Sequence, residues 1–264
     1  MKAESVITDL YVRYHRPEYI HPDPLEIVLR YDDPGEREIA AFIASAFALG
    51  RVGSILQTVE SILDRLPRPL YAIASIRDLD ASFLGFRYRF YGDEDLVDLL
   101  SALGRCLREY GSLKACFLSF FRESDGTVIP ALSRFVEKLR EGSAGLPMLP
   151  DPDKQSACKR LFLFLRWMVR KDAIDPGGWE EIPPSMLIVP VDTHMLKAAR
   201  ALGLTSRRQG DLTTACEITD ALKRIDHEDP VKFDFSLTRL GIHPEFLKSF
   251  RLEMNGRMAN QIRN

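Results

Sequence analysis

The sequence predicts an all-α protein built as two helical lobes. Apolar residues recur at helical spacing through most of the chain, and no segment shows the alternation of a half-buried strand or an Asn-Gly hairpin turn. The chain has 264 residues, of which 45% are hydrophobic. It is therefore long enough for one large domain or two modest ones without a disulfide or a metal ion to stabilise it. Residues 142–153, rich in Gly and Pro, mark the internal boundary.

The first lobe opens on a helix with a strong start signal. Asp33 supplies an N-cap acceptor, followed by Pro at the first helical position and Glu at the third. The apolar residues of this helix run from 39 to 49. Gly50 interrupts it, and an apolar stripe of helical spacing resumes over residues 52–63.

The remaining helices follow from apolar periodicity and from stop signals such as Gly111. We expect them at residues 95–110, 113–122, 128–140, 156–170, 193–202, 212–223 and 231–240. Residues 171–191 contain four prolines and two glycines, which predicts an ordered loop. The predicted division is a helical lobe at 33–145 and a second lobe that joins 1–32 with 146–264.

Charge and hydropathy exclude several classes of protein. Thirty-six Lys and Arg against 38 Asp and Glu give a formal net charge of −2, so any affinity for a polyanion must be local. The first ten residues lack the pattern of a signal peptide, and the longest apolar run, 40–49, is too short to span a bilayer. We expect a soluble cytoplasmic protein without membrane contact.

The four cysteines do not form a metal-binding pattern. No two of them stand in a C-x-x-C motif, and no His/Cys cluster accompanies them. Small buried apolar residues are the expected role for Cys106, Cys116, Cys158 and Cys216. The sequence predicts no metal, no iron–sulfur cluster and no other cofactor.

The strongest local asymmetry of charge lies between residues 154 and 171. These 18 residues contain no acid and six cations: Lys154, Lys159, Arg160, Arg166, Arg170 and Lys171. On a helix, Lys159, Arg166 and Arg170 share one azimuth to within about 20°. Apolar side chains fill most of the remaining circumference, so the pattern predicts a largely buried helix with one cationic ridge. A solvated basic face is the alternative, although such faces usually mix both signs.

A second candidate feature is the tetrad Val-Asp-Thr-His at residues 191–194. Asp192 precedes a helical stripe and Gly203 can end it, so Asp192 is a natural N-cap. His194 falls in the first turn of the same helix. A capping role is sufficient to explain an Asp at position 192. A structural role as a polar residue in the first turn is sufficient to explain His194.

The order of these features resembles the second half of the helix-hairpin-helix DNA glycosylases. The similarity is greatest to the archaeal-type 8-oxoguanine glycosylases and to uncharacterised bacterial relatives, and it covers about residues 149–242. It rests on Leu149-Pro150, Ala157, the apolar helix that follows, Val191-Asp192-Thr193-His194 and Leu202-Gly203-Leu204. The hairpin departs from the usual form, since Asp151 and Asp153 stand at glycine positions and Gln155 at or near the lysine position.

The resemblance implies a two-lobed helix-hairpin-helix fold that binds double-stranded DNA and removes an oxidised base, with 8-oxoguanine as the first expectation. Lys159, which lies 33 residues before Asp192, becomes the nucleophile and Asp192 its partner. Lys154 and Lys171 are the fallback lysines. The resemblance also implies base excision repair at the nucleoid of a prokaryote, with or without lyase activity at the abasic site.

The chemistry explains why these residue types are needed. Breaking a glycosidic bond develops positive charge on the sugar, which a carboxylate at about 4 Å stabilises by roughly 4 kcal/mol at an effective dielectric of 20. A lyase also needs an unprotonated amine to form a Schiff base at C1′, and neighbouring cations such as Arg160 disfavour the ammonium form of a lysine.

The expected DNA contacts come from the same segments. The candidates for phosphate contact are Lys154, Arg160, Arg166, Arg170, Lys171 and His194, and Trp179 in the 171–191 loop is the candidate for the base pocket. The run 87–91, Arg-Tyr-Arg-Phe-Tyr, is of the type that stacks on bases, or is an ordinary loop before a helix.

Two alternatives to the enzyme stay open. One is a catalytically inactive DNA- or RNA-binding relative of the same fold, and the other is a small-molecule enzyme or interaction module. Nothing in the sequence indicates an obligate protein partner.

Overall fold

The computed structural model describes residues 3–66, 68–75, 80–143 and 145–242. It confirms the all-α class, because helices dominate and the β structure of the described residues is one short antiparallel pair of strands. The first half contains α1 (Ala3–Tyr14), α2 (Leu25–Val28), α3 (Pro34–Ala46), α4 (Val52–Leu63), α5 (Pro69–Ser75), α6 (Asp80–Phe83), β1 (Arg87–Tyr88), β2 (Tyr91–Gly92), α7 (Asp93–Tyr110), α8 (Leu113–Phe120) and α9 (Ile129–Arg140). The second half contains α10 (Lys159–Val169), α11 (Thr193–Ala201), α12 (Leu212–Lys223) and α13 (Asp234–Ile242), with short 3₁₀ turns at Pro17–Tyr19, Glu123–Asp125, Pro152–Lys154, Pro184–Met186 and Pro230–Phe233.

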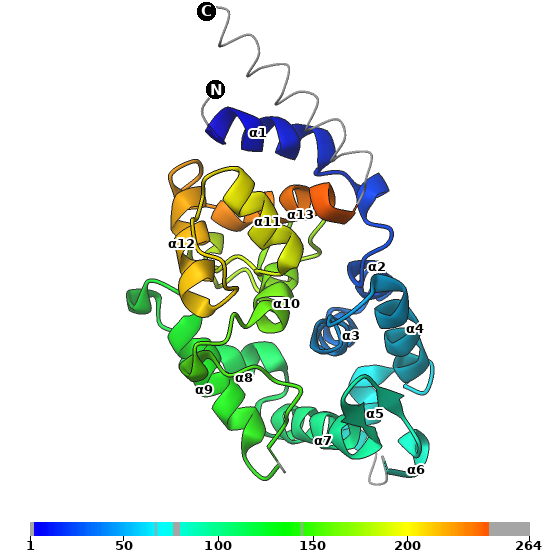
Figure 1. The fold of residues 1–264 in the computed structure, drawn as a ribbon. Helices are drawn as coiled ribbons and strands as arrows, with labels where there is room; N and C mark the ends of the chain where they lie inside the picture. The colour runs from blue at the N-terminus through cyan, green and yellow to red at the C-terminus, as the bar shows by residue number, and fades with distance from the viewer. Residues whose placement is uncertain (1–2, 67, 76–79, 144, 243–264) are drawn as a thin grey trace, which may run out of the picture.

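Helix α3 lies at the centre of the molecule and packs against α10, α2 and α4 (Figure 1). It begins as predicted, because the Asp33 carboxylate accepts a hydrogen bond from the Glu36 N–H at 2.9 Å. Residues 38–46 of this helix are all buried, so α3 is enclosed on every side along most of its length. The predicted break at Gly50 is also present, since α3 ends at Ala46 and α4 begins at Val52.

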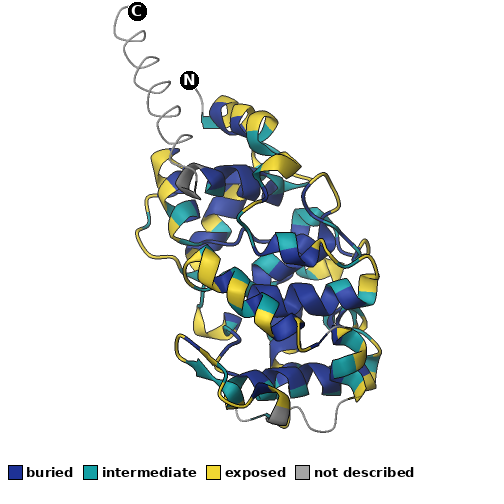
Figure 2. Cartoon of the chain, turned by 90° about the vertical axis from the view of Figure 1, so that its right-hand side faces the viewer, coloured by how far each residue is buried: buried dark blue, intermediate teal, exposed yellow. Residues whose placement is uncertain are grey.

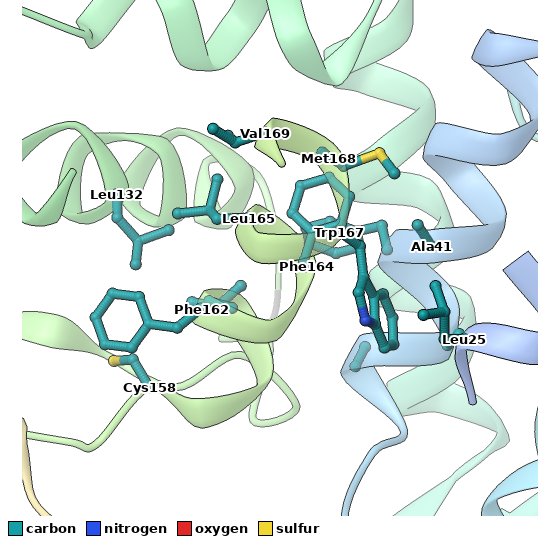
Figure 3. Packing of buried hydrophobic residues seen from close by; sticks show 14 of the residues in the cluster. Leu25, Ala41, Leu132, Cys158, Phe162, Phe164, Leu165, Trp167, Met168 and Val169 are labelled. Atoms are coloured by element: carbon teal, nitrogen blue, oxygen red, sulfur yellow. The ribbon is translucent and has the colours of Figure 1, made fainter. Parts of the chain in front are cut away.

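Helix α10 supplies the large side chains that fill the space beside α3. Its aromatic and branched side chains are buried, except Leu163, which is partly buried, in line with the near-continuous apolar sequence. Figure 3 shows Trp167 extending from α10 toward Ala41 of α3 and Leu25 of α2, while Leu165 faces Leu132 of α9. The buried residues of the whole described chain form one continuous cluster, and Figure 2 shows them concentrated in the central helices.

The first and last described helices lie together. Helix α1 packs on α13 and on the Pro230–Phe233 turn (Figure 1). Tyr11 stacks on His15 with ring centroids 4.5 Å apart and meets the edge of Phe233 at 5.6 Å. The division into lobes at 33–145 and 1–32 with 146–264 stays a prediction, because the core runs without interruption across α3 and α10.

Several elements differ from the sequence prediction, and α2, α5 and α6 were not among the expected helices. The helix expected from residue 156 begins only at Lys159, because Gln155 and Cys158 adopt left-handed backbone conformations with φ of 57° and 46°. The helix expected at 231–240 is a 3₁₀ turn followed by α13. The β1–β2 hairpin was not predicted, since strands of two residues are too short to show alternation.

No helix within the described part of the chain combines the length and the apolar character that a membrane span requires. Cys106, Cys116 and Cys158 are buried as expected, and Cys216 is partly buried.

Candidate functional site

The carboxyl end of α3 gathers cationic side chains from the start of α10. The last carbonyl groups of a helix have no partner within the helix and carry its partial negative charge. Arg160 donates from Nη1 to the Ala46 carbonyl at 2.8 Å, and Lys159 donates from Nζ to the Ala48 carbonyl at 3.2 Å. The turn that follows α3 thus positions the Lys159 amine through Ala48, 111 residues away along the sequence.

Asp192 faces the same amine from the other side. Its Oδ1 atom caps α11 by accepting from the N–H groups of His194 and Met195, both at 2.8 Å. Its Oδ2 atom lies 3.9 Å from Lys159 Nζ. The two side chains are 28% and 27% exposed, so both remain accessible from solvent. The structure therefore brings together the amine and the acid that the sequence singled out.

Lys159 and Asp192 line one cavity of about 440 Å³. Five parts of the chain form its wall: the segment before α2, the α3–α4 turn with the start of α4, α10, the start of α11, and α13. The lining residues are Pro22, Asp23, Pro24, Ala48, Gly50, Arg51, Val52, Ile55, Lys159, Leu163, Arg166, Pro190, Asp192, His194, Asp234 and Thr238. This volume is in the range of pockets that bind small molecules, roughly 300–1,000 Å³.

Asp234 adds a third acid to this wall besides Asp23 and Asp192. It is 2% exposed, and its Oδ2 accepts from Arg166 Nη1 at 2.5 Å while its Oδ1 has no partner among the described residues. Burial raises the pKa of Asp234 to about 6, an effect that Arg166 reduces and the negative charge of Asp192 reinforces. Despite these acids, the described residues contain no group of three or more His, Cys, Asp or Glu side chains arranged to hold a metal ion.

The structure corrects the role expected for Arg166 and Arg170. Both are 3% exposed and engaged in ion pairs, so they are not available to contact DNA phosphates. Asp175, which is fully buried, accepts from Arg166 Nη2 at 2.8 Å and also from Arg170. Arg170 further binds Asp229 at 2.9 Å. Burial alone lowers the pKa of each arginine, but the carboxylates raise it overall, so both remain charged inside the core.

Trp179 is likewise a core residue and not a base-pocket residue. It is 2% exposed and does not line the cavity. Its Nε1 donates to Glu38 Oε1 at 2.9 Å, and its ring lies against Phe117 and Phe164. Glu38 also accepts from the N–H groups of Leu113 and Lys114, so one buried carboxylate joins α3, the start of α8 and the 171–191 loop.

The other candidate cations lie outside the cavity wall. Lys154 is 81% exposed on the segment before α10, with Nζ 3.7 Å from Asp151 Oδ2. Lys171 lies just after the carboxyl end of α10, whereas Lys159 is the first residue of that helix. Asp151 at the predicted hairpin binds Arg140 at 2.7 Å. That carboxylate is therefore already neutralised by a neighbouring cation.

Sequence reasoning missed Asp23, Arg51 and Asp234. Asp23 stands between two prolines and Arg51 follows a helix break, and neither position carries a pattern that indicates a site. Asp234 was hidden inside a predicted helix, where an acid is ordinary. Only the packing of distant segments places these three residues on one wall.

A comparison with protein-family models matches residues 23–243 to DUF2400, described as a protein of unknown function. The chain belongs to the DUF2400 family. The matched region contains every lining residue of the cavity except Pro22. A search of curated proteins and a search of solved structures each gave no match.

This result corrects the family assignment drawn from the sequence. The model that matches is DUF2400 and not a helix-hairpin-helix DNA glycosylase family, and the match spans the whole stretch of 149–242 on which the resemblance rested. Short motifs such as Val-Asp-Thr-His before a helix also arise from capping alone, which explains why they misled.

Proposed function

We propose that this protein is a DNA N-glycosylase with lyase activity, in which Lys159 is the nucleophile and Asp192 its carboxylate partner. One observation carries the proposal: Lys159 Nζ and Asp192 Oδ2 lie 3.9 Å apart on the wall of an accessible cavity. The family name gives no activity, so the chemistry of the site is the support.

The pair suits attack on a sugar carbon. Lys159 Nζ, which is accessible to solvent, loses its proton to water, and the free amine then forms a bond to C1′ of a damaged nucleotide while Asp192 stays ionised. The C1′–N bond to the base breaks, its electron pair leaves with the base, and the base takes a proton from water. The attacking nitrogen then loses a proton. The C1′–O4′ bond opens, O4′ takes a proton, and the product is a Schiff base. Asp192 also stabilises positive charge on the sugar.

The surroundings favour a nucleotide as the ligand. Arg51 is exposed and lines the cavity, where it can contact a phosphate. His194 lines the cavity beside Asp192 and provides a further hydrogen-bonding group. We propose double-stranded DNA as the partner, with the duplex lying over the cavity and the damaged nucleotide turned into it. An oxidised purine such as 8-oxoguanine is the first substrate to test.

The decisive experiment is trapping with borohydride. Duplexes containing 8-oxoguanine or an abasic site are incubated with the protein, and borohydride reduces any Schiff base to a stable covalent adduct. We expect an adduct with the wild type and none with Lys159→Gln. Lys171→Gln is the matched control, because this lysine lies off the cavity wall and must keep the adduct.

Trapping that survives in Lys159→Gln would overturn the assignment of the nucleophile. The absence of an adduct together with the absence of base release, on a panel of oxidised, deaminated and alkylated bases, would overturn the enzyme.

A specific observation favours nucleic-acid binding without catalysis as the second candidate. The Lys159 amine already donates to the Ala48 carbonyl and pairs with Asp192, which is the arrangement of a structural ammonium ion. Duplex binding that weakens steeply with salt, without base release, would select this alternative.

A further inference from the structure

The β1–β2 hairpin presents an aromatic side chain to solvent. Residues 87–92 form two strands of two residues joined by Arg89 and Phe90. Arg89 has a φ of 54°, so the turn uses the left-handed backbone region that tight hairpins need. Phe90 is 81% exposed, and the Arg89 guanidinium lies 5.4 Å from the centre of its ring.

The hairpin is held firmly on the turn that lines the cavity. Tyr88 is buried, meets the edge of Phe47 at 5.5 Å, and donates its hydroxyl to the Leu49 carbonyl at 2.7 Å. Arg89 donates to the same carbonyl at 3.3 Å. Gly50 has a φ of 135°, which favours glycine, and a Cβ atom there would lie only 3.1 Å from the Tyr88 hydroxyl.

A second contact joins the hairpin to α10. Arg160 donates from one nitrogen to both the Ala46 carbonyl and the Tyr91 hydroxyl, the latter at 3.4 Å. Arg160 is adjacent in sequence to Lys159. The exposed ring of Phe90 is therefore carried by a short rigid element that is fixed to two parts of the cavity wall, the α3–α4 turn and the start of α10.

An exposed aromatic ring beside a cation matches the chemistry of stacking on a nucleobase. A base offers a flat π-face to the ring, and its phosphate offers a negative charge to the guanidinium. We propose that Phe90 stacks on a base of the DNA next to the nucleotide in the cavity, with Arg89 contacting the backbone. This inference rests on the proposed function for its partner and extends it to a surface outside the cavity.

The test measures the affinity for a duplex that contains a tetrahydrofuran abasic analogue, on which no glycosidic bond can be broken. Loss of one stacked base should weaken binding by about 10- to 100-fold, so Phe90→Ala should raise Kd by that factor. Phe90→Trp should preserve or improve the affinity. Phe90→Leu, which keeps an apolar side chain without a π-face, should resemble Phe90→Ala.

Tyr71→Ala is a matched control. Tyr71 is also an exposed aromatic residue, at 55%, with the Arg68 guanidinium 4.0 Å from its ring centre. It lies near the opposite end of α3, since the neighbouring Leu70 N–H donates to Glu36 at the start of that helix. Its replacement should leave Kd unchanged.

The outcomes separate this inference from the proposed function. An unchanged Kd in Phe90→Ala overturns the stacking role. Equal Kd values for Phe90→Leu and the wild type overturn it as well, because they indicate an apolar contact that does not need a π-face. If borohydride trapping fails while Phe90→Ala and Phe90→Leu still weaken duplex binding, stacking stands and the enzyme does not. If trapping succeeds and Phe90→Ala leaves Kd unchanged, only the inference fails.

Discussion

Asp192 uses its two carboxylate oxygens for different purposes. Oδ1 caps α11 through two backbone N–H groups, and Oδ2 faces the Lys159 amine. Asparagine can still cap a helix through its side-chain oxygen, but it carries no charge. The two roles can therefore be separated by choosing the replacement.

We expect Asp192→Asn to lose the reaction and keep the stability. Removing a carboxylate charge about 4 Å from the sugar costs roughly 4 kcal/mol of electrostatic stabilisation at an effective dielectric of 20, or about three orders of magnitude in the rate of base release. The free energy of unfolding should change by only a few tenths of a kcal/mol, whereas Asp192→Ala should lose about 1 kcal/mol as well. Single-turnover kinetics and urea denaturation measure the two effects. A rate within tenfold of the wild type in Asp192→Asn would contradict a catalytic charge.

Asp234 predicts a dependence of stability on pH. Its pKa in the folded protein, about 6, is above the ordinary value of 3.8, so the folded state binds more protons than the unfolded state between these values. Ionisation of Asp234 therefore destabilises the fold as the pH rises from 4 through 6. The neutral variant Asp234→Asn lacks this effect, and its stability relative to the wild type should rise by up to roughly 3 kcal/mol between pH 4 and pH 7. Urea denaturation of both proteins at the two pH values tests this, and a constant difference would contradict it.

At the scale of elements, α10 joins two environments. Its first turn presents Lys159 and Arg160 to the carboxyl end of α3, while its later turns bury Arg166 among acids from α13 and the 171–191 loop. The ion pairs of the later turns fix the helix in rotation, and this fixes the direction of Lys159. The cationic ridge predicted from the sequence thus divides in two: Lys159 faces the cavity, whereas Arg166 and Arg170 form buried ion pairs.

The buried ion pairs should be costly to break at one partner. Asp175→Asn leaves the Arg166 and Arg170 guanidinium groups with less compensating charge in the core, which should lower the free energy of unfolding by about 3–5 kcal/mol. Urea denaturation measures the loss. Glu228→Gln is the control, because its pair with His227 lies in solvent and its replacement should leave the unfolding midpoint unchanged. Equal midpoints for both variants would show that the buried network is not structurally important.

Elements were predictable where their signals are local. The Asp33 cap and the left-handed Gly111 at the end of α7 are both read from a few neighbouring residues, and both are present. The burial of Arg170 and Trp179 was not predictable in this way. Their partners Asp229 and Glu38 lie 59 and 141 residues away, and no local pattern shows such pairs.

At the scale of the whole molecule, the chain is nearly neutral, so any attraction to DNA must come from a local group of exposed cations. The formal net charge is −2, and the exposed cations near the cavity and the hairpin include Arg51 and Arg89, with Lys154 on the segment before α10. If these three neutralise three phosphates, a plot of log K against log salt for duplex binding should have a slope of about −2.7.

Replacing one of these cations gives a sharper test of the same prediction. Arg51→Gln should reduce the magnitude of the slope by about 0.9, because one fewer phosphate is neutralised. Fluorescence polarisation between 50 and 200 mM salt covers a suitable range. Binding that is insensitive to salt would show that the ligand is not a polyanion.

The candidate site was predictable only in part for the same physical reason. The approach of Lys159 to Asp192 follows from two motifs that the sequence displays, whereas the cavity wall needs five segments to converge. This convergence depends on how distant segments pack around α3. The residues next to Asp23 and Asp234 in the sequence therefore show no pattern that indicates a site.

The double use of Asp192 also bears on how this family can diverge. A gene duplicate with Asn or Ser at this position would still cap α11 and would fold normally. It would no longer present a negative charge to Lys159. Selection on structure alone tolerates that change, and selection on chemistry does not. Genotyping this single codon across descendants would therefore distinguish lineages under catalytic constraint from lineages that only preserve the scaffold.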